Sequence, residues 1–244
     1  MKTALITGAT AGIGESAARK LVSAGWKVIG TGRRVDRLDR LAAEFGDSFR
    51  AIVLDMRDTA AFDQLANNVG PVDLLLNNAG LAPPMSALQE ADQDPIDTVI
   101  ETNIAGLVAL TRALLPGLIE RKGAIINLSS VAATYPYRGG AVYAGSKAFV
   151  RQFSLGLRCD LAGSGVRVTS IEPGMVETEF TLVRTGGDQA ASNALYAGID
   201  PMTAEDIADT ILWVATLPPH ININALELMP VSQSWAGFTV ERKA

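Results

Sequence analysis

The chain has 244 residues, of which 48% are hydrophobic and 19% charged, so its composition is that of an ordinary globular protein rather than a disordered one. A single cysteine and a single histidine exclude an internal disulfide framework, a cysteine-rich zinc site and any mechanism that needs two histidines. The net charge of −5 would repel a phosphate backbone, so we expect no nucleic-acid partner.

No segment of the chain has the composition of a membrane span. The longest apolar stretch, at 104–119, contains Arg112 and Pro116 and is shorter than the roughly 18 apolar residues that a span needs. The apolar start at 4–6 is followed at once by glycine-rich sequence and Glu15, which is not typical of a signal peptide. We therefore expect a soluble, cytoplasmic protein with no membrane partner.

Short apolar runs alternate with longer amphipathic segments in the first part of the chain. The runs predict strands at 4–6, 27–30, 51–54 and 74–76. The amphipathic segments predict helices at 13–24, 35–45 and 59–69.

The same alternation continues to the C-terminal part. Helices are predicted near 92–101, 104–119, 141–163 and 203–215, and strands at 124–128, 166–171 and 225–229. The intervening segment 179–200 contains Gly186, Gly187 and Gly198, which could serve as hinges, so we interpret it as a lid over a substrate site.

Strands that alternate with helices predict βαβ units and a parallel sheet. The strands lack polar alternation, as expected when helices cover both faces of the sheet. Because the rhythm is unbroken and no repeat or linker interrupts it, we predict an α/β protein with one domain over 1–244. Its fold is expected to be a Rossmann-type, doubly wound parallel sheet of about seven strands.

The loop after the first strand is rich in glycine. Residues 7–14 read TGATAGIG, a G-x-x-x-G-x-G pattern between a strand and a helix. Glycine permits a tight turn and a close approach of the backbone, and the helix N-terminus attracts the pyrophosphate of a dinucleotide. This loop is therefore predicted to bind a dinucleotide, the alternative being a plain strand–helix connection.

Two arginines follow the second strand. Dinucleotide sites that prefer NAD usually carry an acidic residue here, whereas this chain has Arg33 and Arg34, with Arg37 one helical turn later. Guanidinium groups suit the 2′-phosphate of NADP, and cations at a helix N-terminus are unfavourable without an anion nearby. We predict NADP (NADPH) as the cofactor, the alternative being a solvated basic helix start.

Polar residues follow the next two strands. Asp55, with Met56 beside it, stands where a carboxylate could meet the adenine amino group, although it could instead cap a helix. Asn78, Ala79 and Gly80 follow the fourth strand and suit a loop whose backbone touches a ligand.

A tyrosine and a lysine occupy one face of the long predicted helix. Tyr143 and Lys147 are four residues apart, and Ser130 ends the preceding strand. A neighbouring ammonium would lower the tyrosine pKa from its usual value near 10 and give a general acid/base without histidine. Ser130 could then hydrogen-bond the substrate oxygen.

Taken together, these motifs resemble the short-chain dehydrogenase/reductase family over essentially the whole chain. The motifs are TGATAGIG (7–14), NNAG (77–80), Asn103, Ser130, YAGSK (143–147) and PGMVET (173–178). The resemblance implies Tyr143 as the acid/base, Lys147 on the nicotinamide ribose, Ser130 orienting the substrate and Asn103 helping to hold a proton-relay water. The catalytic residues predicted are thus Ser130, Tyr143, Lys147 and Asn103.

The resemblance also completes the predicted cofactor site. It implies that Thr178 bonds the nicotinamide carboxamide, while position 11, often basic in NADP-dependent members, is Ala11 here. The full set of predicted cofactor-binding residues is Gly8, Thr10, Ala11, Gly12, Ile13, Gly14, Arg33, Arg34, Asp55, Met56, Asn78, Ala79, Gly80, Tyr143, Lys147, Pro173, Gly174, Val176 and Thr178. No metal site is expected.

Further segments resemble a bacterial subgroup, the NADP-dependent 3-hydroxy acid (serine or allo-threonine) dehydrogenases. They are 31–38, 147–155, 171–180, 213–219 and 221–237. Sulfoacetaldehyde reductases resemble the same subgroup, so these motifs do not separate the two. The resemblance also implies a homotetramer or homodimer built through 104–119 and 141–163.

Two arginines are rival candidates for an anion clamp. Arg138, in the loop before Tyr143, and Arg184, in the predicted lid, could each hold a carboxylate or a sulfonate. Arg138 could also be a solvent-facing or interface residue. The predicted substrate-binding residues are Ser130, Tyr137, Arg138, Tyr143 and Arg184.

We therefore expect an NADP(H)-dependent oxidoreductase that transfers a hydride between the cofactor and a small anionic alcohol or carbonyl, with a short 3-hydroxy acid as the preferred substrate. Sulfoacetaldehyde reduction to isethionate is the first alternative. A catalytically inactive NADP-sensing protein is the second, and the presence of Ser130, Tyr143 and Lys147 argues against it.

Overall fold

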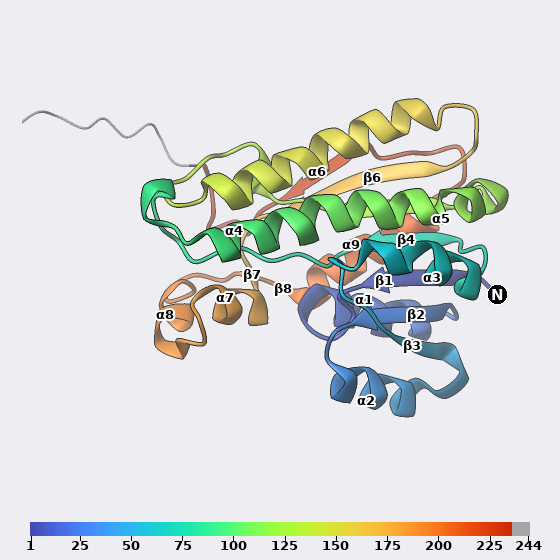
Figure 1. Cartoon of the computed structure of the whole chain (residues 1–244), viewed down its shortest axis with the longest axis horizontal. Coiled ribbons are helices and arrows are strands. Elements are labelled where there is room, and N and C mark those ends of the chain that lie inside the picture. Colours follow the sequence, from blue (N-terminus) through green and yellow to red (C-terminus); the bar gives the residue numbers. More distant parts are fainter. Residues whose placement is uncertain (236–244) are drawn as a thin grey trace, which may run out of the picture.

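The short apolar runs form one seven-stranded sheet in which all strand pairings are parallel (Figure 1). The computed structural model describes residues 1–235. The strands of this sheet are β1 (Thr3–Thr7), β2 (Lys27–Gly32), β3 (Phe49–Val53), β4 (Leu74–Asn77), β5 (Ala124–Leu128), β6 (Arg167–Pro173) and β9 (Ala225–Leu228). The predicted fold class and strand number are confirmed.

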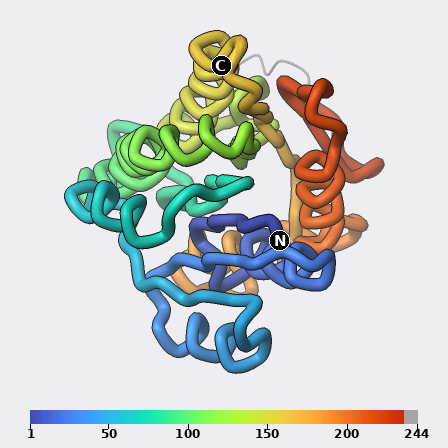
Figure 2. Tube along the Cα trace, turned by 90° about the vertical axis from the view of Figure 1, so that its right-hand side faces the viewer, coloured from blue at the N-terminus to red at the C-terminus, as the bar shows by residue number. Residues whose placement is uncertain are grey.

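Helices cover both faces of the sheet. The helices are α1 (Gly12–Ser23), α2 (Val35–Phe45), α3 (Phe62–Val69), α4 (Gln93–Ile100), α5 (Leu107–Arg121), α6 (Ala141–Asp160), α7 (Glu179–Arg184), α8 (Gln189–Ala194) and α9 (Ala204–Thr216). Figure 2 shows α9, in orange-red, beside the blue α1, and these two helices pack against each other on one face. Helices α3, α5 and α6 supply the apolar side chains on the other face.

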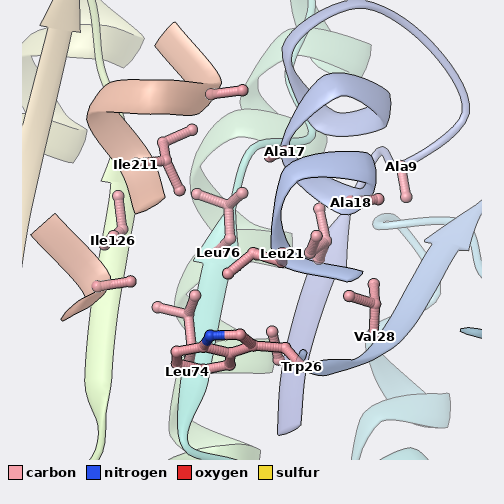
Figure 3. Packing of buried hydrophobic residues seen from close by; sticks show 14 of the residues in the cluster. Ala9, Ala17, Ala18, Leu21, Trp26, Val28, Leu74, Leu76, Ile126 and Ile211 are labelled. Atoms are coloured by element: carbon pink, nitrogen blue, oxygen red, sulfur yellow. The ribbon is translucent and has the colours of Figure 1, made fainter. Parts of the chain in front are cut away.

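Alternate residues of each strand point to the two faces, so the sheet divides the core into two clusters. Leu74, Leu76 and Ile126 pack with Leu21 of α1 and Ile211 of α9, as Figure 3 shows. The residues between them in the strands, among them Leu75 and Ile125, pack against α3, α5 and α6. This explains why the strands have continuous apolar runs, as predicted.

The strand order places a crevice beside the first strand. The order is β3-β2-β1-β4-β5-β6-β9, so the chain winds outward from β1 in one direction and from β4 in the other. In open parallel sheets, ligands bind at the carboxyl ends of the strands where this reversal occurs. The glycine-rich turn follows β1 and the NNAG motif begins at the end of β4, so both motifs lie at the reversal.

The predicted lid, 179–200, contains α7 and α8. It lies at the carboxyl end of the sheet (Figure 1) and is joined to the rest by a small second sheet of β7 (Val176–Glu177) and β8 (Met202–Thr203). Strands of two residues carry too little pattern to be predicted from sequence. Gly186, Gly187 and Gly198 all have positive φ, which glycine adopts without strain.

The two helices predicted near 92–101 and 104–119 are joined into one helical run. A π-helical segment, Glu101–Gly106, connects α4 to α5, so the boundary expected between them is absent. The run continues through Arg112 and Pro116, in agreement with the helix predicted over 104–119. Short π-helical segments within α-helices are frequent at functional sites, and this one contains Asn103.

Within residues 1–235, the run Gln93–Arg121 is long and apolar enough to cross a membrane by length and composition. Core helices of soluble proteins meet the same criterion, and 44% of the relevant window is buried within the protein. Leu110, Leu114 and Leu118 of α5 belong to the second core cluster. The apolar character of this helix is therefore accounted for in part by its packing on the sheet.

The turn between β1 and α1 depends on close backbone packing. A Cβ at Gly14 would lie 2.3 Å from the carbonyl oxygen of Gly8 and 2.4 Å from Nδ2 of Asn78. Real Cβ atoms do not approach that closely, and neither neighbour is the free end of a flexible chain. Glycine is required here because the first turn of α1 packs directly on the backbone of Gly8 and on the hydrogen-bonded amide of Asn78.

Gly14→Ala should therefore destabilise the fold. Overpacking against backbone typically costs about 1–3 kcal/mol of unfolding free energy, and we expect this loss in urea unfolding monitored by circular dichroism. Gly156→Ala in α6 is the matched control, because nothing lies within 4 Å of its Cβ position. The control should gain up to about 1 kcal/mol from helix propensity. Equal effects of the two substitutions would contradict this account of the turn.

Candidate active site

A cleft of about 400 Å³ opens at the carboxyl ends of the strands, where the strand order reverses. All predicted cofactor-binding residues except Gly14 line it, and Gly14 lies behind the turn. Of the predicted catalytic residues, Ser130, Tyr143 and Lys147 line the cleft. The cleft thus brings together motifs that are more than 160 positions apart in the chain.

Two polar side chains hold the glycine-rich turn in place. Nδ2 of Asn78 donates hydrogen bonds to the carbonyl oxygens of Thr7 and Gly8, at 2.9 and 3.1 Å. Oγ1 of Thr7 accepts the backbone N–H groups of Asn78 and Ala79, both at 3.0 Å. Gly8 and Gly12 have φ of 68° and 51°. Asn78 therefore shapes the turn that would carry a pyrophosphate.

The arginines after β2 lie at one end of the cleft. Both Arg33 and Arg34 line it. Arg34 donates from Nε and Nη2 to Oγ1 of Thr10, at 3.2 and 3.0 Å, which holds its guanidinium beside the glycine-rich turn. Arg37, one turn along α2, donates to the backbone oxygen of Thr10 at 3.3 Å. The cleft therefore ends in a cluster of cations that suits an anionic group.

Asp55 lines the cleft in an ionised state. Its carboxylate accepts the backbone N–H of Arg57 at 3.0 Å and pairs with the Arg57 guanidinium at 2.7 Å. These bonds lower the pKa of Asp55 to about 2. The next helical turn begins at Thr59 and is preceded by Asp58, so Asp55 does not cap it.

Tyr143, Lys147 and Ser130 meet in the middle of the cleft. Tyr143 and Lys147 lie on the first turns of α6, and Nζ of Lys147 is 5.8 Å from the centre of the Tyr143 ring. Nζ donates to the backbone oxygen of Leu128 at 2.8 Å, at the end of β5. Ser130 donates to the carbonyl oxygen of Pro173 at 3.3 Å. The three side chains therefore come from α6 and from the segment after β5, and β6 contributes the carbonyl oxygen of Pro173.

Burial changes the ionisation of both groups on α6. It raises the pKa of Tyr143 to about 12, against which the Ser130 hydroxyl and the Arg184 cation act in the opposite direction. It lowers the pKa of Lys147 to about 8. Desolvation disfavours the charged form in each case. A phenolate at position 143 consequently requires stabilisation by neighbouring cations, which Lys147 and Arg184 can supply.

Asn103 is bound beside the cleft and does not line it. Its side-chain oxygen accepts the N–H of Leu81 at 3.0 Å, and its Nδ2 donates to the Leu81 oxygen at 2.9 Å and to Oγ of Ser146 at 3.0 Å. The π-helical segment places Asn103 where these bonds are possible. A Cβ on Gly80 would lie 3.3 Å from both Oδ1 of Asn103 and Nζ of Lys147, so the three groups are neighbours.

The structure separates the two candidate anion clamps. The Arg184 guanidinium lies 5.6 Å from the centre of the Tyr143 ring and 5.4 Å from that of Tyr137, whose hydroxyl accepts a hydrogen bond from it at 2.9 Å. Nε of Arg184 is buried and has no hydrogen-bond partner within residues 1–235. Arg138 is exposed, and none of Tyr137, Arg138 and Arg184 is among the residues that line the cleft. What separates the two arginines is that Arg184 lies over the ring of Tyr143.

Several cleft residues were not anticipated from the sequence, and two of them come from α7. Phe180 of α7 lines the cleft and has its ring centre 5.7 Å from that of Tyr143. Glu179, next to it, also lines the cleft and pairs with Arg34 and Arg37. Both directly follow the PGMVET motif, and this proximity was the only sequence signal that could have placed them in the cleft.

Comparison with known proteins assigns the chain to a family. Residues 2–186 match the model of the family described as short chain dehydrogenase. Serine 3-dehydrogenase of Agrobacterium fabrum is 58% identical, with 99% of each chain covered. Sulfoacetaldehyde reductase 2 of Chromohalobacter salexigens is 53% identical, with 98% of each chain covered.

A solved structure has the same fold over nearly its entire length. The closed form of serine dehydrogenase complexed with NADP⁺ superimposes with a TM-score of 0.96 and 48% identity, covering 99% of this chain and all of the other. The C-terminal segment that motivated the subgroup resemblance, 221–237, extends two residues beyond the described residues.

Lys147→Met should remove a pH-dependent destabilisation of the protein without cofactor. The lysine pKa falls from 10.5 to about 8 on folding, so between these values the unfolded chain binds more protons and stability rises with pH. From pH 7 to pH 10 the wild type should gain about 2–3 kcal/mol of unfolding free energy relative to the variant. Urea unfolding at both pH values measures this gain, and a difference that does not change with pH would contradict it.

Proposed function

The chain belongs to the short-chain dehydrogenase family, and we propose that it is an NADP(H)-dependent oxidoreductase acting on a small anionic alcohol or carbonyl, with a short 3-hydroxy acid of the serine type as its substrate. The observation that carries this proposal is the buried, unpartnered Nε of Arg184 beside the ring of Tyr143. A serine 3-dehydrogenase at 58% identity supports the choice of substrate.

The residues of the glycine-rich turn would hold the pyrophosphate of the cofactor, and Arg33 and Arg34 its 2′-phosphate. The fit is good because Gly8 and Gly12 have positive φ and leave the backbone open to a ligand, and because the cleft ends in guanidinium groups. Asp55 would meet the adenine, and Thr178 and Val176 the nicotinamide end. When bound, the nicotinamide accepts or supplies the hydride.

Tyr143 would act as the general acid/base. In oxidation its phenolate takes the proton of the substrate hydroxyl, and in reduction its hydroxyl gives that proton back. The Lys147 ammonium and the Arg184 guanidinium favour the phenolate and offset the burial that raises the tyrosine pKa to about 12. Ser130 would donate a hydrogen bond to the reacting oxygen, and Asn103 would help to hold a relay water near Lys147.

Arg184 would bind the anionic end of the substrate. A buried guanidinium N–H without a partner costs free energy that a carboxylate or sulfonate oxygen would recover. Because Arg184 lies over the Tyr143 ring, it would fix the hydroxyl-bearing carbon of a short acid close to the acid/base. Arg138 is exposed, and we do not propose that it binds the anionic end of the substrate.

Sulfoacetaldehyde reduction is the second candidate, since a relative with that name is 53% identical and a sulfonate suits the same guanidinium. An inactive NADP-sensing protein is disfavoured because Ser130, Tyr143 and Lys147 are all present in one cleft.

We also propose a cytoplasmic homotetramer or homodimer that uses α5 and α6 as contact surfaces. Ile119 of α5 and Phe149 of α6 support this, since their side chains are large, apolar and exposed. The proposed domain comprises 1–244, with 179–200 as its lid.

The proposal is tested by steady-state kinetics on four substrates. L-serine and 3-hydroxypropionate with NADP⁺, and sulfoacetaldehyde and succinic semialdehyde with NADPH, should separate the two candidates by kcat/KM. We expect L-serine to be oxidised with NADP⁺ at least tenfold more efficiently than with NAD⁺.

Tyr143→Phe is the control in the same assay. Loss of the acid/base should lower kcat at least about a hundredfold, while the Kd for NADPH changes less than about twofold. Residual turnover equal to that of the wild type would remove Tyr143 from the mechanism, and inactivity of the wild type on every substrate would favour the sensing protein.

Arg184→Gln should raise the KM for the anionic substrate about 10- to 100-fold, because a charge-assisted hydrogen bond from a half-buried guanidinium is lost. The KM for a neutral aldehyde of the same length should change less than about threefold, while any effect on kcat through the Tyr143 pKa should be shared by both substrates. Arg138→Gln is the matched control and should leave both KM values unchanged. Equal KM changes for both substrates in Arg184→Gln would exclude it as the clamp.

A further inference from the structure

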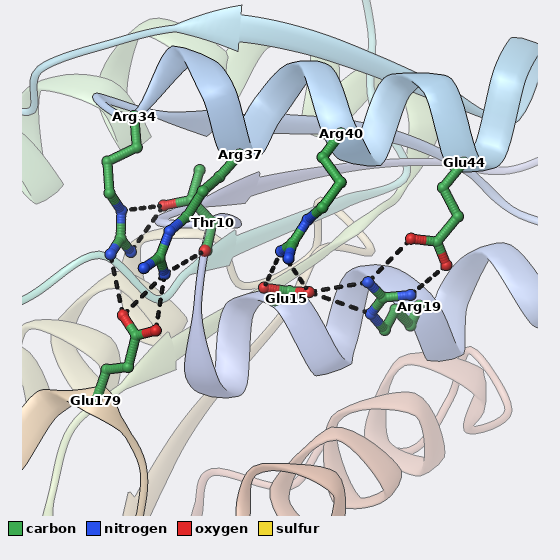
Figure 4. A network of polar contacts seen from close by, with 8 residues as sticks. All are labelled: Thr10, Glu15, Arg19, Arg34, Arg37, Arg40, Glu44 and Glu179. Carbon is green, nitrogen blue, oxygen red and sulfur yellow. Dashed lines mark hydrogen bonds and ion pairs between the residues drawn. The ribbon is translucent and has the colours of Figure 1, made fainter.

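A single carboxylate from the lid occupies the arginines at the end of the cleft, as Figure 4 shows. Oε2 of Glu179 is 3.0 Å from Nη1 of Arg34, and both of its carboxylate oxygens are 2.8 Å from Nη1 of Arg37. These bonds, the Arg37 bond first, lower the pKa of Glu179, so the group is an anion at neutral pH.

This carboxylate stands where an anionic ligand group would be expected to bind. Arg34 already uses Nε and Nη2 on Thr10, and Nη1 on Glu179, so three of its donor directions are engaged. A phosphate bound to Arg34 would share that guanidinium with the Glu179 carboxylate and would lie close to it. Two anions at that separation repel each other, and the guanidinium cannot pair fully with both.

Arg33 differs from its two neighbours. It lines the cleft, and no hydrogen bond or ion pair joins its side chain to another described residue. Three arginines thus lie with the Glu179 carboxylate at this end of the cleft, and the nearby Asp55 carboxylate is paired with Arg57. A phosphate is therefore attracted to the cluster as a whole, while Glu179 reduces the attraction at Arg34 and Arg37.

Glu179 also belongs to a different part of the chain from the arginines that it binds. It is the first residue of α7, directly after Thr178, whereas Arg34 and Arg37 lie at the start of α2. The ion pairs therefore fasten the first turn of the lid to the opposite wall of the cleft. All three side chains are partly exposed, with 31–44% of the side-chain surface accessible. Exposed ion pairs are weak, so another anion can replace Glu179 on these arginines.

We propose that Glu179 is a specificity-determining residue of the cofactor site. It occupies the arginines in place of a 2′-phosphate, so that uptake of a 2′-phosphorylated nucleotide displaces Glu179 from Arg34 and frees the first turn of the lid. The inference rests on the proposed binding of NADP(H) in this cleft. Glu179 acts on the cofactor through the arginines. It lowers the affinity for NADP(H), and because it belongs to the lid, it links cofactor binding to the position of the lid's first turn.

The test is calorimetric titration with adenosine 2′,5′-bisphosphate and with 5′-AMP, which differ only in the 2′-phosphate. Glu179→Gln should bind the bisphosphate about three- to tenfold more tightly than the wild type, since one competing ion-pair acceptor and one repelling charge are removed. Its affinity for 5′-AMP should not change. Glu44→Gln is the matched control, because Glu44 is paired with Arg19 on the outer surface of α1 and α2, away from the cleft.

Unchanged or weaker binding of the bisphosphate by Glu179→Gln would overturn the proposal. If instead the wild type did not distinguish the bisphosphate from 5′-AMP, the assignment of NADP(H) to the cleft would fail, and the two failures are thereby separated.

A second measurement uses the wild-type protein alone, so it does not depend on how the variant folds. In hydrogen–deuterium exchange, the bisphosphate should speed exchange in the segment 179–184 at least about twofold, whereas 5′-AMP should leave it unchanged. Slower exchange in this segment with the bisphosphate would show that Glu179 and the phosphate bind the arginines together, and would also overturn the proposal.

Discussion

The structure depends on one close approach, where the first turn of α1 lies against the backbone of Gly8, after β1, and the side chain of Asn78, after β4. Gly14 has no room for a Cβ beside Gly8 and Asn78, and Asn78 bonds the two carbonyl oxygens of the turn. Because this contact fixes the helix N-terminus at the point where the strand order reverses, it also fixes where an anionic cofactor can bind. The arginines after β2 and the proposed catalytic groups after β5 are arranged around that point.

Tyr143 and Lys147, the proposed catalytic groups, are buried at a cost to their charged forms. Without a ligand, burial raises the pKa of Tyr143 to about 12 and lowers that of Lys147 to about 8. Each of these shifts opposes the ion pair that the chemistry needs, a phenolate beside an ammonium. Arg184 adds a cation on the lid side of Tyr143, so the group that is proposed to hold the substrate also favours the phenolate.

Much of the fold was accessible from the sequence because local patterns carry it. The helix at 35–45 and the strand at 124–128 have the predicted bounds, since apolar periodicity and glycine boundaries are short-range signals. The joint at Asn103 was not predicted, because the π-helical segment is stabilised by bonds to Leu81 and Ser146, which are distant in sequence. Likewise, nothing local distinguishes Arg184 from Arg138, and only the folded lid separates them.

The ion pairs of Glu179 have a consequence for redesign of the cofactor preference. An acidic residue at position 34, which would suit the ribose hydroxyls of NADH, would remove a partner of Glu179 and place a second carboxylate beside it. The repulsion between the two would act on the lid as well as on the cofactor. Residues 34, 37 and 179 are therefore coupled, and a substitution at position 34 that changes the cofactor preference requires matching substitutions at positions 37 and 179.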